Sequence, residues 1–201
     1  MKLVLSVAVL IAWTALAGPA QAQSDLSIRF RGTIDAANAQ SLTVTTNAGE
    51  KLTLVLPAQT PVLDARKVGL GSIKPGSFVG VAAQPQPDGS LVALEVHVFA
   101  KSLRGTGEGS YPWDLGSNSV MTNGNVSTAV GTSGRTLTVQ YAGGEKTIQV
   151  PKTVPVVLVD KGRRSLLKLG HKVVIIATKS PAGDVTVRRV YVGRAGVTPP
   201  M

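Results

Sequence analysis

The chain of 201 residues carries 21 Lys and Arg against 11 Asp and Glu, which gives a formal net charge of +10. It contains no cysteine, and this excludes disulfides, thiolate metal sites and a lipid anchor on a cysteine. The 22 glycines and 12 prolines, together with 4% aromatic residues and no sustained helical period, predict short strands joined by many turns.

Residues 1–22 predict a cleaved secretory signal peptide. A single Lys2 precedes an apolar run, and residues 20–22 form the small-x-small pattern that a signal peptidase recognises. The alternative is a membrane anchor, but the run is short for a span of about 20 residues, and a Gly-Pro pair interrupts it. We therefore expect a periplasmic or secreted protein that begins near Gln23 and has no transmembrane segment after cleavage.

Residues 23–103 are the first of two similar β-rich units. Alternating apolar and hydroxyl residues predict a strand at 41–45, and the turn at 47–50 leads into a second strand at 51–56. Pro57 and Pro61 end this pairing because proline has no N–H to donate, and an irregular crossing follows. Two further strands are predicted at 78–83 and 91–99, separated by a tight turn at 88–90.

Residues 124–201 repeat this order as a second, more basic unit with a short tail. The matches are Leu42-Thr43-Val44 with Leu137-Thr138-Val139, Gly49-Glu50-Lys51 with Gly144-Glu145-Lys146, and Pro57 and Pro61 with Pro151 and Pro155. Their spacing shifts by one residue along the chain, which predicts an internal duplication. Residues 104–123 form a Gly-rich joint between the units, and the joint carries aromatic side chains.

The strands and turns of both units resemble those of a known family. The residues that carry the resemblance are Gly-Thr-Ile at 32–34, Ser-Leu-Thr-Val at 41–44, Ile-Lys-Pro-Gly-Ser-Phe-Val at 73–79 and Asp-Gly-Ser-Leu-Val-Ala at 88–93. They are similar to the bacterial family of exported domains of unknown function numbered 5666. Tyr-Pro-Trp-Asp at 111–114, Met-Thr-Asn at 121–123 and the tail at 192–201 resemble a two-copy subgroup of it.

This resemblance implies an all-β chain, a tandem of two small barrels of the oligonucleotide/oligosaccharide-binding (OB-like) shape. It implies no catalytic residues. The second unit departs from the family pattern at Leu169, where the turn proline is expected, and at Ala182, where an aspartate is expected.

The positive charge is concentrated in the second half of the chain. Residues 23–100 carry six basic and six acidic side chains, whereas residues 101–201 carry fourteen basic and five acidic ones. An ordinary solvated surface is the simpler explanation, and the functional alternative is a basic face for an anionic envelope polymer or lipid headgroup. Nucleic acid is the weakest candidate partner because few aromatic side chains are available for stacking. The candidate binding residues are Arg163, Arg164, Lys168, Lys172, Arg188 and Arg189 of the second unit, and Tyr111 and Trp113 of the joint.

The joint aromatics have two interpretations. Tyr111 and Trp113 could dock between the units and determine how the units lie, which we favour, or they could form an exposed platform for a sugar or peptide. Glu95 and His97 share one face of the predicted strand at 91–99, and with Met121 they are weak candidates for a metal site. A tetrahedral site needs three or four convergent donors, so an ordinary polar strand face is the favoured explanation.

No catalytic site and no cofactor is predicted. The chain lacks the Gly-x-Ser-x-Gly elbow of serine hydrolases, and the glycines at 105–109 lack the Gly-Lys-Ser/Thr ending of a phosphate loop. We therefore expect a non-enzymatic exported binding or scaffolding module that contacts an anionic envelope partner through the second unit. The alternatives are an accessory protein for metal handling and, least favoured, an enzyme.

Overall fold

The computed structural model describes residues 26–130 and 135–199, and the predicted signal peptide lies outside these residues. The described chain is all-β, with thirteen strands and three short 3₁₀ helices. The strands are β1 (Leu26–Ala37), β2 (Ser41–Thr46), β3 (Lys51–Val55), β4 (Val62–Val68), β5 (Phe78–Pro85), β6 (Leu91–Phe99), β7 (Gly109–Pro112), β8 (Val120–Val130), β9 (Thr136–Tyr141), β10 (Gly144–Gln149), β11 (Val156–Lys161), β12 (Lys172–Lys179) and β13 (Val185–Gly193). The helices are η1 (Leu70–Ser72), η2 (Lys101–Leu103) and η3 (Arg164–Leu166). No helix among these residues combines the length and the apolar character needed to cross a membrane.

The strands predicted in the first unit are confirmed as β2, β3, β5 and β6. Their local pattern explains this: Leu42 and Val44 of β2 are buried, while the threonines between them lie toward the surface. The predicted irregular crossings are wrong in part, because each contains a strand, β4 in the first unit and β11 in the second. The joint likewise contains a strand, β7.

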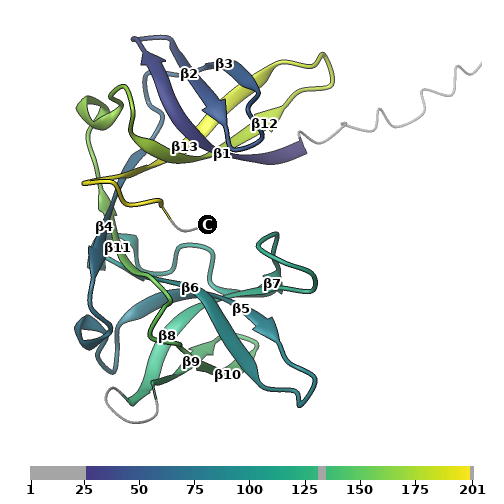
Figure 1. Ribbon diagram of the computed structural model, residues 1–201, viewed down its shortest axis with the longest axis vertical. Helices are drawn as coiled ribbons and strands as arrows, with labels where there is room; N and C mark the ends of the chain where they lie inside the picture. The colour runs from purple at the N-terminus through teal and green to yellow at the C-terminus, as the bar shows by residue number, and fades with distance from the viewer. Residues whose placement is uncertain (1–25, 131–134, 200–201) are drawn as a thin grey trace, which may run out of the picture.

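Two lobes make up the molecule, joined along one side by β4 and β11 (Figure 1). The upper lobe of Figure 1 contains β1, β2, β3, β12 and β13, and the lower lobe contains β5 to β10. The pairing order is β10-β9-β8-β5-β6-β11-β4-β13-β12-β1-β2-β3, and β7 pairs with β8. One further bridge in each lobe joins β3 to β13 and β10 to β6.

Each lobe takes strands from both units of the sequence. β1 of the first unit pairs antiparallel with β12 of the second over eight residues, while β8 of the second unit pairs with β5 of the first. β4 and β11 cross between the lobes and pair with each other, Asp64 opposite Asp160. Our prediction that residues 23–103 and 124–201 each close a barrel of their own is therefore wrong. All thirteen strands belong to one sheet, and the lobes exchange strands.

Glycine permits a close approach at matching points of the two lobes. A Cβ on Gly32 of β1 would lie 2.3 Å from the carbonyl oxygen of Thr45, and one on Gly124 of β8 would lie 2.1 Å from that of Gln140. No side chain can be tolerated at either distance, so β1 and β8 can each bend over the neighbouring strand only with glycine there.

Three apolar clusters form the core. One fills the upper lobe around Ile34, Val44 and Ile175, and another fills the lower lobe around Val81, Val96 and Val139. The third, which we call the inter-lobe cluster, contains Leu63, Phe78, Phe99, Val159, Val174 and Tyr191, with Leu103, Trp113 and Ile176 packed against it.

The inter-lobe cluster explains why two strands have almost continuous apolar sequences. In β12, Val173 and Ile175 belong to the upper-lobe core, whereas Val174 between them belongs to the inter-lobe cluster. β5 does the same in the lower lobe, where Phe78 faces the cluster and Val79 faces the core. A strand that is covered on both faces needs apolar residues at successive positions.

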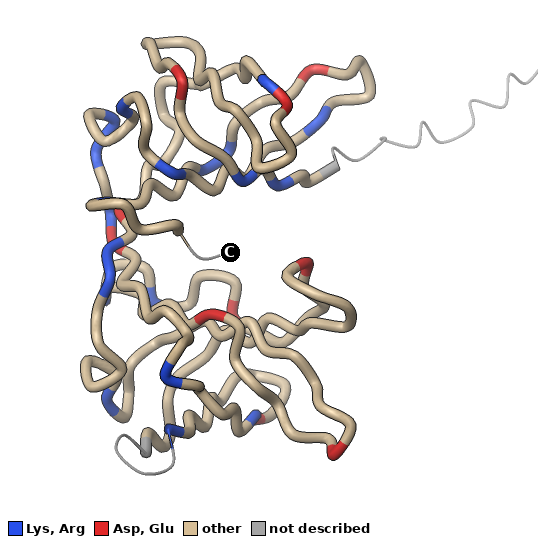
Figure 2. Tube along the Cα trace, viewed as in Figure 1, with Lys and Arg blue, Asp and Glu red and all other residues tan. Residues whose placement is uncertain are grey.

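The charge excess of the second half of the chain becomes an excess of the upper lobe in the fold. Residues 26–61 and 162–199, which form the upper lobe, carry eleven basic and three acidic side chains, whereas residues 69–155 carry six basic and five acidic ones. Basic residues of the second unit are joined in the upper lobe by Arg29 and Arg31 of the first, and they lie near its boundary with the lower lobe and at η3 (Figure 2).

Candidate functional site

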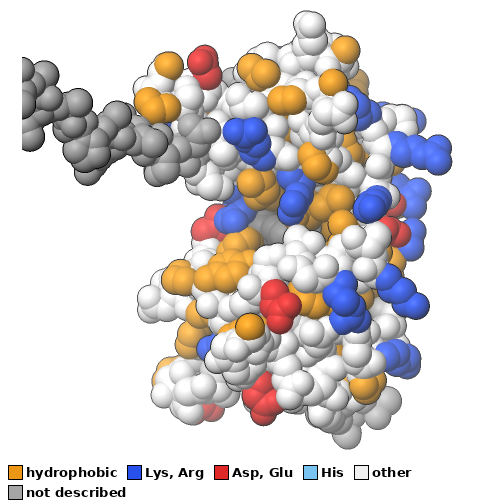
Figure 3. All heavy atoms as spheres, turned by 180° about the vertical axis from the view of Figure 1, so that it is seen from behind, with side chains coloured by type: hydrophobic (Ala, Val, Ile, Leu, Met, Phe, Trp, Pro, Cys, Tyr) orange, Lys and Arg blue, Asp and Glu red, His pale blue; other side chains and the backbone are white. Residues whose placement is uncertain are grey.

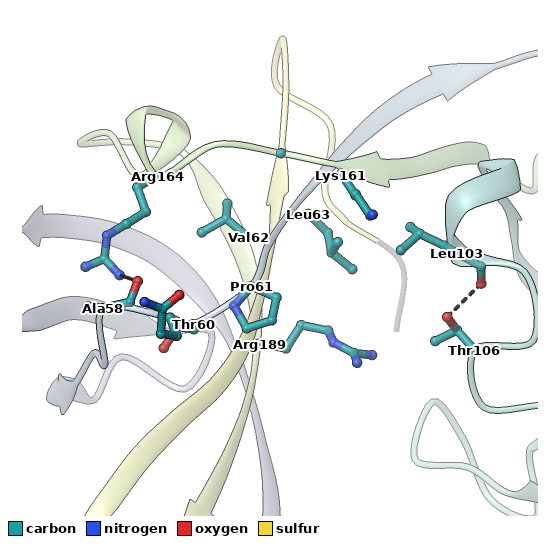
Figure 4. A pocket seen from close by; sticks show the side chains of 12 residues that line it. Ala58, Thr60, Pro61, Val62, Leu63, Leu103, Thr106, Lys161, Arg164 and Arg189 are labelled. Carbon is teal, nitrogen blue, oxygen red and sulfur yellow. Dashed lines mark hydrogen bonds between the residues drawn. The ribbon is translucent and has the colours of Figure 1, made fainter.

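A pocket of about 440 Å³ opens beside the strands that connect the lobes. Its lining residues are Ala58, Gln59, Thr60, Pro61, Val62, Leu63, Leu103, Thr106, Lys161, Gly162, Arg164 and Arg189. They come from the loop before β4, from β4 itself, from η2, from the joint, from the end of β11, from η3 and from β13. We call this the inter-lobe pocket, because the crossing strands and the joint bring together walls that are far apart in the sequence (Figure 4).

Side chains alternate between the two faces of the strands, and this places basic residues in the pocket and carboxylates on the opposite face. Lys161 of β11 lies opposite Leu63 of β4, and Leu63 lies opposite Tyr191 of β13, so these three side chains share one face of the sheet. Arg189 precedes Tyr191 by two residues and lies on the same face. The neighbouring carboxylates, Asp64 and Asp160, belong to the other face. The lining accordingly contains three basic residues and no acidic one.

The Arg164 side chain forms hydrogen bonds that stabilise the fold. Its Nη1 donates to the carbonyl oxygens of Pro57 at 2.9 Å and Ala58 at 3.3 Å, and its Nη2 donates to that of Ala39 at 3.0 Å. One guanidinium thus ties η3 to the loops that follow β1 and β3. Arg164 was predicted to be a binding residue, but its Nη1 and Nη2 groups donate to backbone oxygens, so it is a poor candidate for a ligand contact.

The side chains of Lys161 and Arg189 make fewer hydrogen bonds within the protein than that of Arg164 does. Arg189 Nη1 donates to the hydroxyl of Tyr191 at 3.2 Å, a neutral partner. No carboxylate within residues 26–130 and 135–199 forms an ion pair with either head group. Both head groups extend toward the side of the pocket where Leu103 and Thr106 lie (Figure 4).

The other predicted basic residues lie outside the pocket. Arg163, Lys168, Lys172 and Arg188 are exposed on the upper lobe, and Arg188 donates from Nε to the Thr178 hydroxyl at 3.0 Å. Seen from behind, Lys and Arg side chains gather along the side where the lobes are connected and around the hollow between the lobes (Figure 3). The predicted residues therefore divide between a surface of the upper lobe and the inter-lobe pocket.

The joint docks between the lobes, as the favoured interpretation predicts. Trp113 packs on the inter-lobe cluster, the Arg29 guanidinium carbon lies 3.9 Å from the centre of its ring, and the Tyr111 ring is 5.9 Å from it. Asp114 accepts from Arg29 Nη1 and Arg31 Nη2, each at 2.8 Å, so the joint is bound to β1 of the upper lobe. Hydrogen bonds from Arg31, and then from Arg29, hold the pKa of the half-exposed Asp114 at about 2. With Arg29 on its face, Trp113 is a structural contact and not an open platform.

A buried polar face lies beneath the joint. Gly80 of β5 pairs with His97 on one side and Asn123 on the other, and a Cβ on Gly80 would lie 1.9 Å from His97 Nε2 and 2.3 Å from Asn123 Oδ1. The missing side chain gives these two room. Asn123 donates to the carbonyl oxygen of Gly107 and to the Tyr111 hydroxyl, both at 2.9 Å, and so holds the joint loop to the lower lobe.

His97 is fully buried and neutral at ordinary pH. Burial lowers its pKa to about 4, and the Asn123 side chain offsets part of that lowering. Neither ring nitrogen has a hydrogen bond of normal geometry among the described residues, although Asn123 is near. Phe99 meets the ring edge-on at 5.1 Å between centres.

The weak metal candidates share this face. Glu95 and Met121 both lie opposite Ala82, and His97 lies opposite Gly80, so all three are on one side of the β6-β5-β8 sheet. The part of the chain that the structure describes contains no group of three or more His, Asp or Glu side chains that could hold a metal ion.

Several residues of the site were missed from sequence. Arg29, Arg31 and Asp114 are far apart along the chain, and only the pairing of β1 with β12 brings the arginines to the joint. Leu63 and Leu103 looked like ordinary apolar residues. Lys161 is part of the basic stretch that continues with Arg163 and Arg164 in the sequence, but its place in the pocket follows only from the register of β11 on β4.

Comparison with known proteins adds the family. No curated protein and no solved structure matches the chain. The family model described as Domain of unknown function (DUF5666) matches residues 31–97, which run from β1 to β6 and thus contribute to both lobes. This part of the chain belongs to that family.

Proposed function

We propose that the protein is a non-enzymatic binding module of an exported compartment, and that it contacts an anionic partner through its upper lobe. The supporting observation is the division of charge, with eleven basic against three acidic side chains in the upper lobe and near balance in the lower lobe. A concentration of one sign on one side of a molecule raises the local concentration of a partner of the opposite sign and speeds its association. The exposed residues Arg163, Lys168 and Lys172 form the proposed contact surface.

In the same proposal, each lobe is an OB-like module that arose by duplication. The matched pairings support this: β1–β12 corresponds to β8–β5, and the single bridge β13–β3 corresponds to β6–β10. The equivalent glycines, Gly32 and Gly124, support it as well. The joint sequence and the second copy would then define the two-copy subgroup, in which strand exchange locks the copies together.

The test compares two charge-reversed variants that change net charge equally. Arg163→Glu, Lys168→Glu and Lys172→Glu together alter the upper-lobe surface, whereas Lys74→Glu, Lys101→Glu and Lys152→Glu alter exposed positions of the lower lobe. Retention on heparin and binding to vesicles that contain phosphatidylglycerol should fall strongly for the first variant and only slightly for the second. Retention should also weaken with rising salt. Equal losses in the two variants would show that only net charge matters and would remove the proposed surface.

Metal handling is the second candidate. It is favoured by one observation, the two unbonded ring nitrogens of buried His97 on the same face as Glu95 and Met121. Calorimetry with copper, zinc and nickel separates the candidates, because tight stoichiometric binding that His97→Leu abolishes would rank metal handling first. The exported location is tested by fractionating cells and by the mass of the mature chain, which should begin near Gln23.

A further inference from the structure

The inter-lobe pocket combines two uncompensated cations with an apolar wall. Lys161 and Arg189 have no carboxylate partner among the described residues, and the side chains between them in Figure 4 are those of Leu63 and Leu103. Leu63 is 4% exposed and belongs to the inter-lobe cluster, against which Leu103 packs, so this wall is apolar. Cations beside a low-dielectric wall attract an anion more strongly than the same cations on an open surface.

Both hydroxyl groups that line the pocket are already hydrogen-bonded within the protein. The Thr60 hydroxyl donates to the carbonyl oxygen of Val187, and the Thr106 hydroxyl donates to that of Leu103, so neither proton is free for a ligand. Arg164 is occupied by backbone carbonyls. The side-chain donors left for a ligand are the Lys161 ammonium, the remaining N–H groups of the Arg189 guanidinium and the amide of exposed Gln59, and only the first two are charged.

We propose that the inter-lobe pocket binds a small amphiphilic anion. Its carboxylate or phosphate group would lie between Lys161 and Arg189, and its short apolar body would lie on Leu63, Leu103 and the exposed ring of Pro61. The volume of about 440 Å³ is within the range of small-molecule sites. The site differs from the upper-lobe surface of Arg163, Lys168 and Lys172, and it rests on the proposed function only in taking the ligand to be anionic.

The position of the pocket predicts a mechanical effect of binding. Leu103 belongs to η2, which follows β6 of the lower lobe, whereas Arg189 belongs to β13 of the upper lobe. A ligand that contacts both residues joins the lobes. Ligand binding should therefore raise the unfolding temperature of the whole chain in proportion to the logarithm of ligand concentration, once that concentration exceeds the dissociation constant.

The experiment uses hexanoate and hexyl phosphate as probes, measured by calorimetry against the full chain. Both should bind, whereas hexanol, inorganic phosphate and hexyltrimethylammonium should each bind at least tenfold more weakly, because each lacks one half of the required chemistry or carries the wrong charge. Lys161→Met and Arg189→Met should each weaken hexyl phosphate binding about tenfold, the effect expected for losing one charge-assisted hydrogen bond. Lys161→Arg and Arg189→Lys should restore most of it.

The control is Lys179→Met, which removes one positive charge from an exposed position of the upper lobe that belongs neither to the pocket nor to the surface of Arg163, Lys168 and Lys172. It should leave hexyl phosphate binding within twofold, and circular dichroism should show that all variants are folded. Hexyl phosphate binding that is unchanged by Lys161→Met and Arg189→Met would overturn the proposal, and so would equal binding of hexanol. Binding of phosphatidylglycerol vesicles that depends on Lys161 and Arg189, without binding of free hexyl phosphate, would place the anion in a membrane and would also overturn it.

These outcomes are independent of the proposed function. The variant carrying Arg163→Glu, Lys168→Glu and Lys172→Glu should lose heparin retention and keep hexyl phosphate binding within a few-fold. Lys161→Met and Arg189→Met should do the reverse.

Discussion

The strand exchange between the lobes can be tested with one engineered disulfide. Ser27 of β1 lies directly opposite Thr178 of β12, an antiparallel pair whose Cβ atoms are about 5 Å apart, within the range that a disulfide can bridge after a small adjustment. The natural chain has no cysteine, so Ser27→Cys and Thr178→Cys supply the only two thiols of each chain. We expect this variant to form an intrachain disulfide under mild oxidation.

The expected stabilisation follows from the length of the closed loop. Ser27 and Thr178 enclose about 150 residues, and the loss of loop entropy in the unfolded chain is worth about 5 kcal/mol by the chain-entropy relation. For a domain of this size, that corresponds to a rise in the melting temperature of about 10–20 °C, and less where the bond strains the strands. Urea denaturation of the oxidised and reduced forms gives the difference directly.

The matched control is Ser27→Cys with Gln84→Cys. Gln84 of β5 holds the position in the first unit that Thr178 holds in the second, so this pair would be bridged if each unit closed its own sheet. In the exchanged fold, β1 and β5 lie in different lobes, and the control should stay reduced. The reasoning is refuted if the control forms the bond and the first variant does not, or if the bond of the first variant joins two chains on a non-reducing gel.

Three further predictions concern the side chains of His97, Arg164 and Trp113. The pKa of His97 is about 4 in the folded chain and 6.5 in the unfolded chain, so between these pH values the unfolded chain binds a proton that the folded chain does not. The free energy of unfolding should therefore be highest above pH 6.5 and fall by about 3 kcal/mol as the pH drops toward 4. Urea denaturation across this range should show the decline, and a similar slope in His97→Leu would contradict its assignment to His97. Arg164→Met should cost about 2 kcal/mol of unfolding free energy, because it frees the backbone oxygens of two loops, whereas the exposed neighbour change Arg163→Met should cost less than about 0.5 kcal/mol. In a chain that begins at Gln23, Trp113 is the sole tryptophan, so the emission should be blue-shifted and slowly quenched by acrylamide, and a red, readily quenched emission would count against docking of the joint.

His97 and Asp114 contribute to the free energy of unfolding in different pH ranges. His97 is buried, so its full shift contributes to stability, whereas Asp114 is about half exposed and its ion pairs with Arg29 and Arg31 are weakened by solvent and salt. The contribution of Asp114 is present above its ordinary pKa of 3.8 and is lost as the pH falls toward 2. The two contributions therefore disappear in successive pH ranges, first that of His97 and then that of Asp114.

Local patterns in the sequence were sufficient for the individual strands and hairpins. Leu42 and Val44 alternate with threonines, and the turn residues at 47–50 join β2 to β3 as expected, because a hairpin depends only on residues that are near in the chain. The apolar residues and the aromatic joint were also recognisable. β4 was missed because its charged residues, Asp64, Arg66 and Lys67, hide the alternation.

Only the tertiary structure decided which strands share a lobe and which cations share a pocket. β5 and β12 have equivalent sequences, so either could supply the same backbone hydrogen bonds to β1, and local pattern cannot choose between them. The choice depends on long-range packing: the joint, Trp113 and the inter-lobe cluster bury apolar surface between the lobes when β4 and β11 cross. Lys161 and Arg189 lie in one pocket for the same reason, because the register of three strands from both units, and not their distance along the chain, places them on one face.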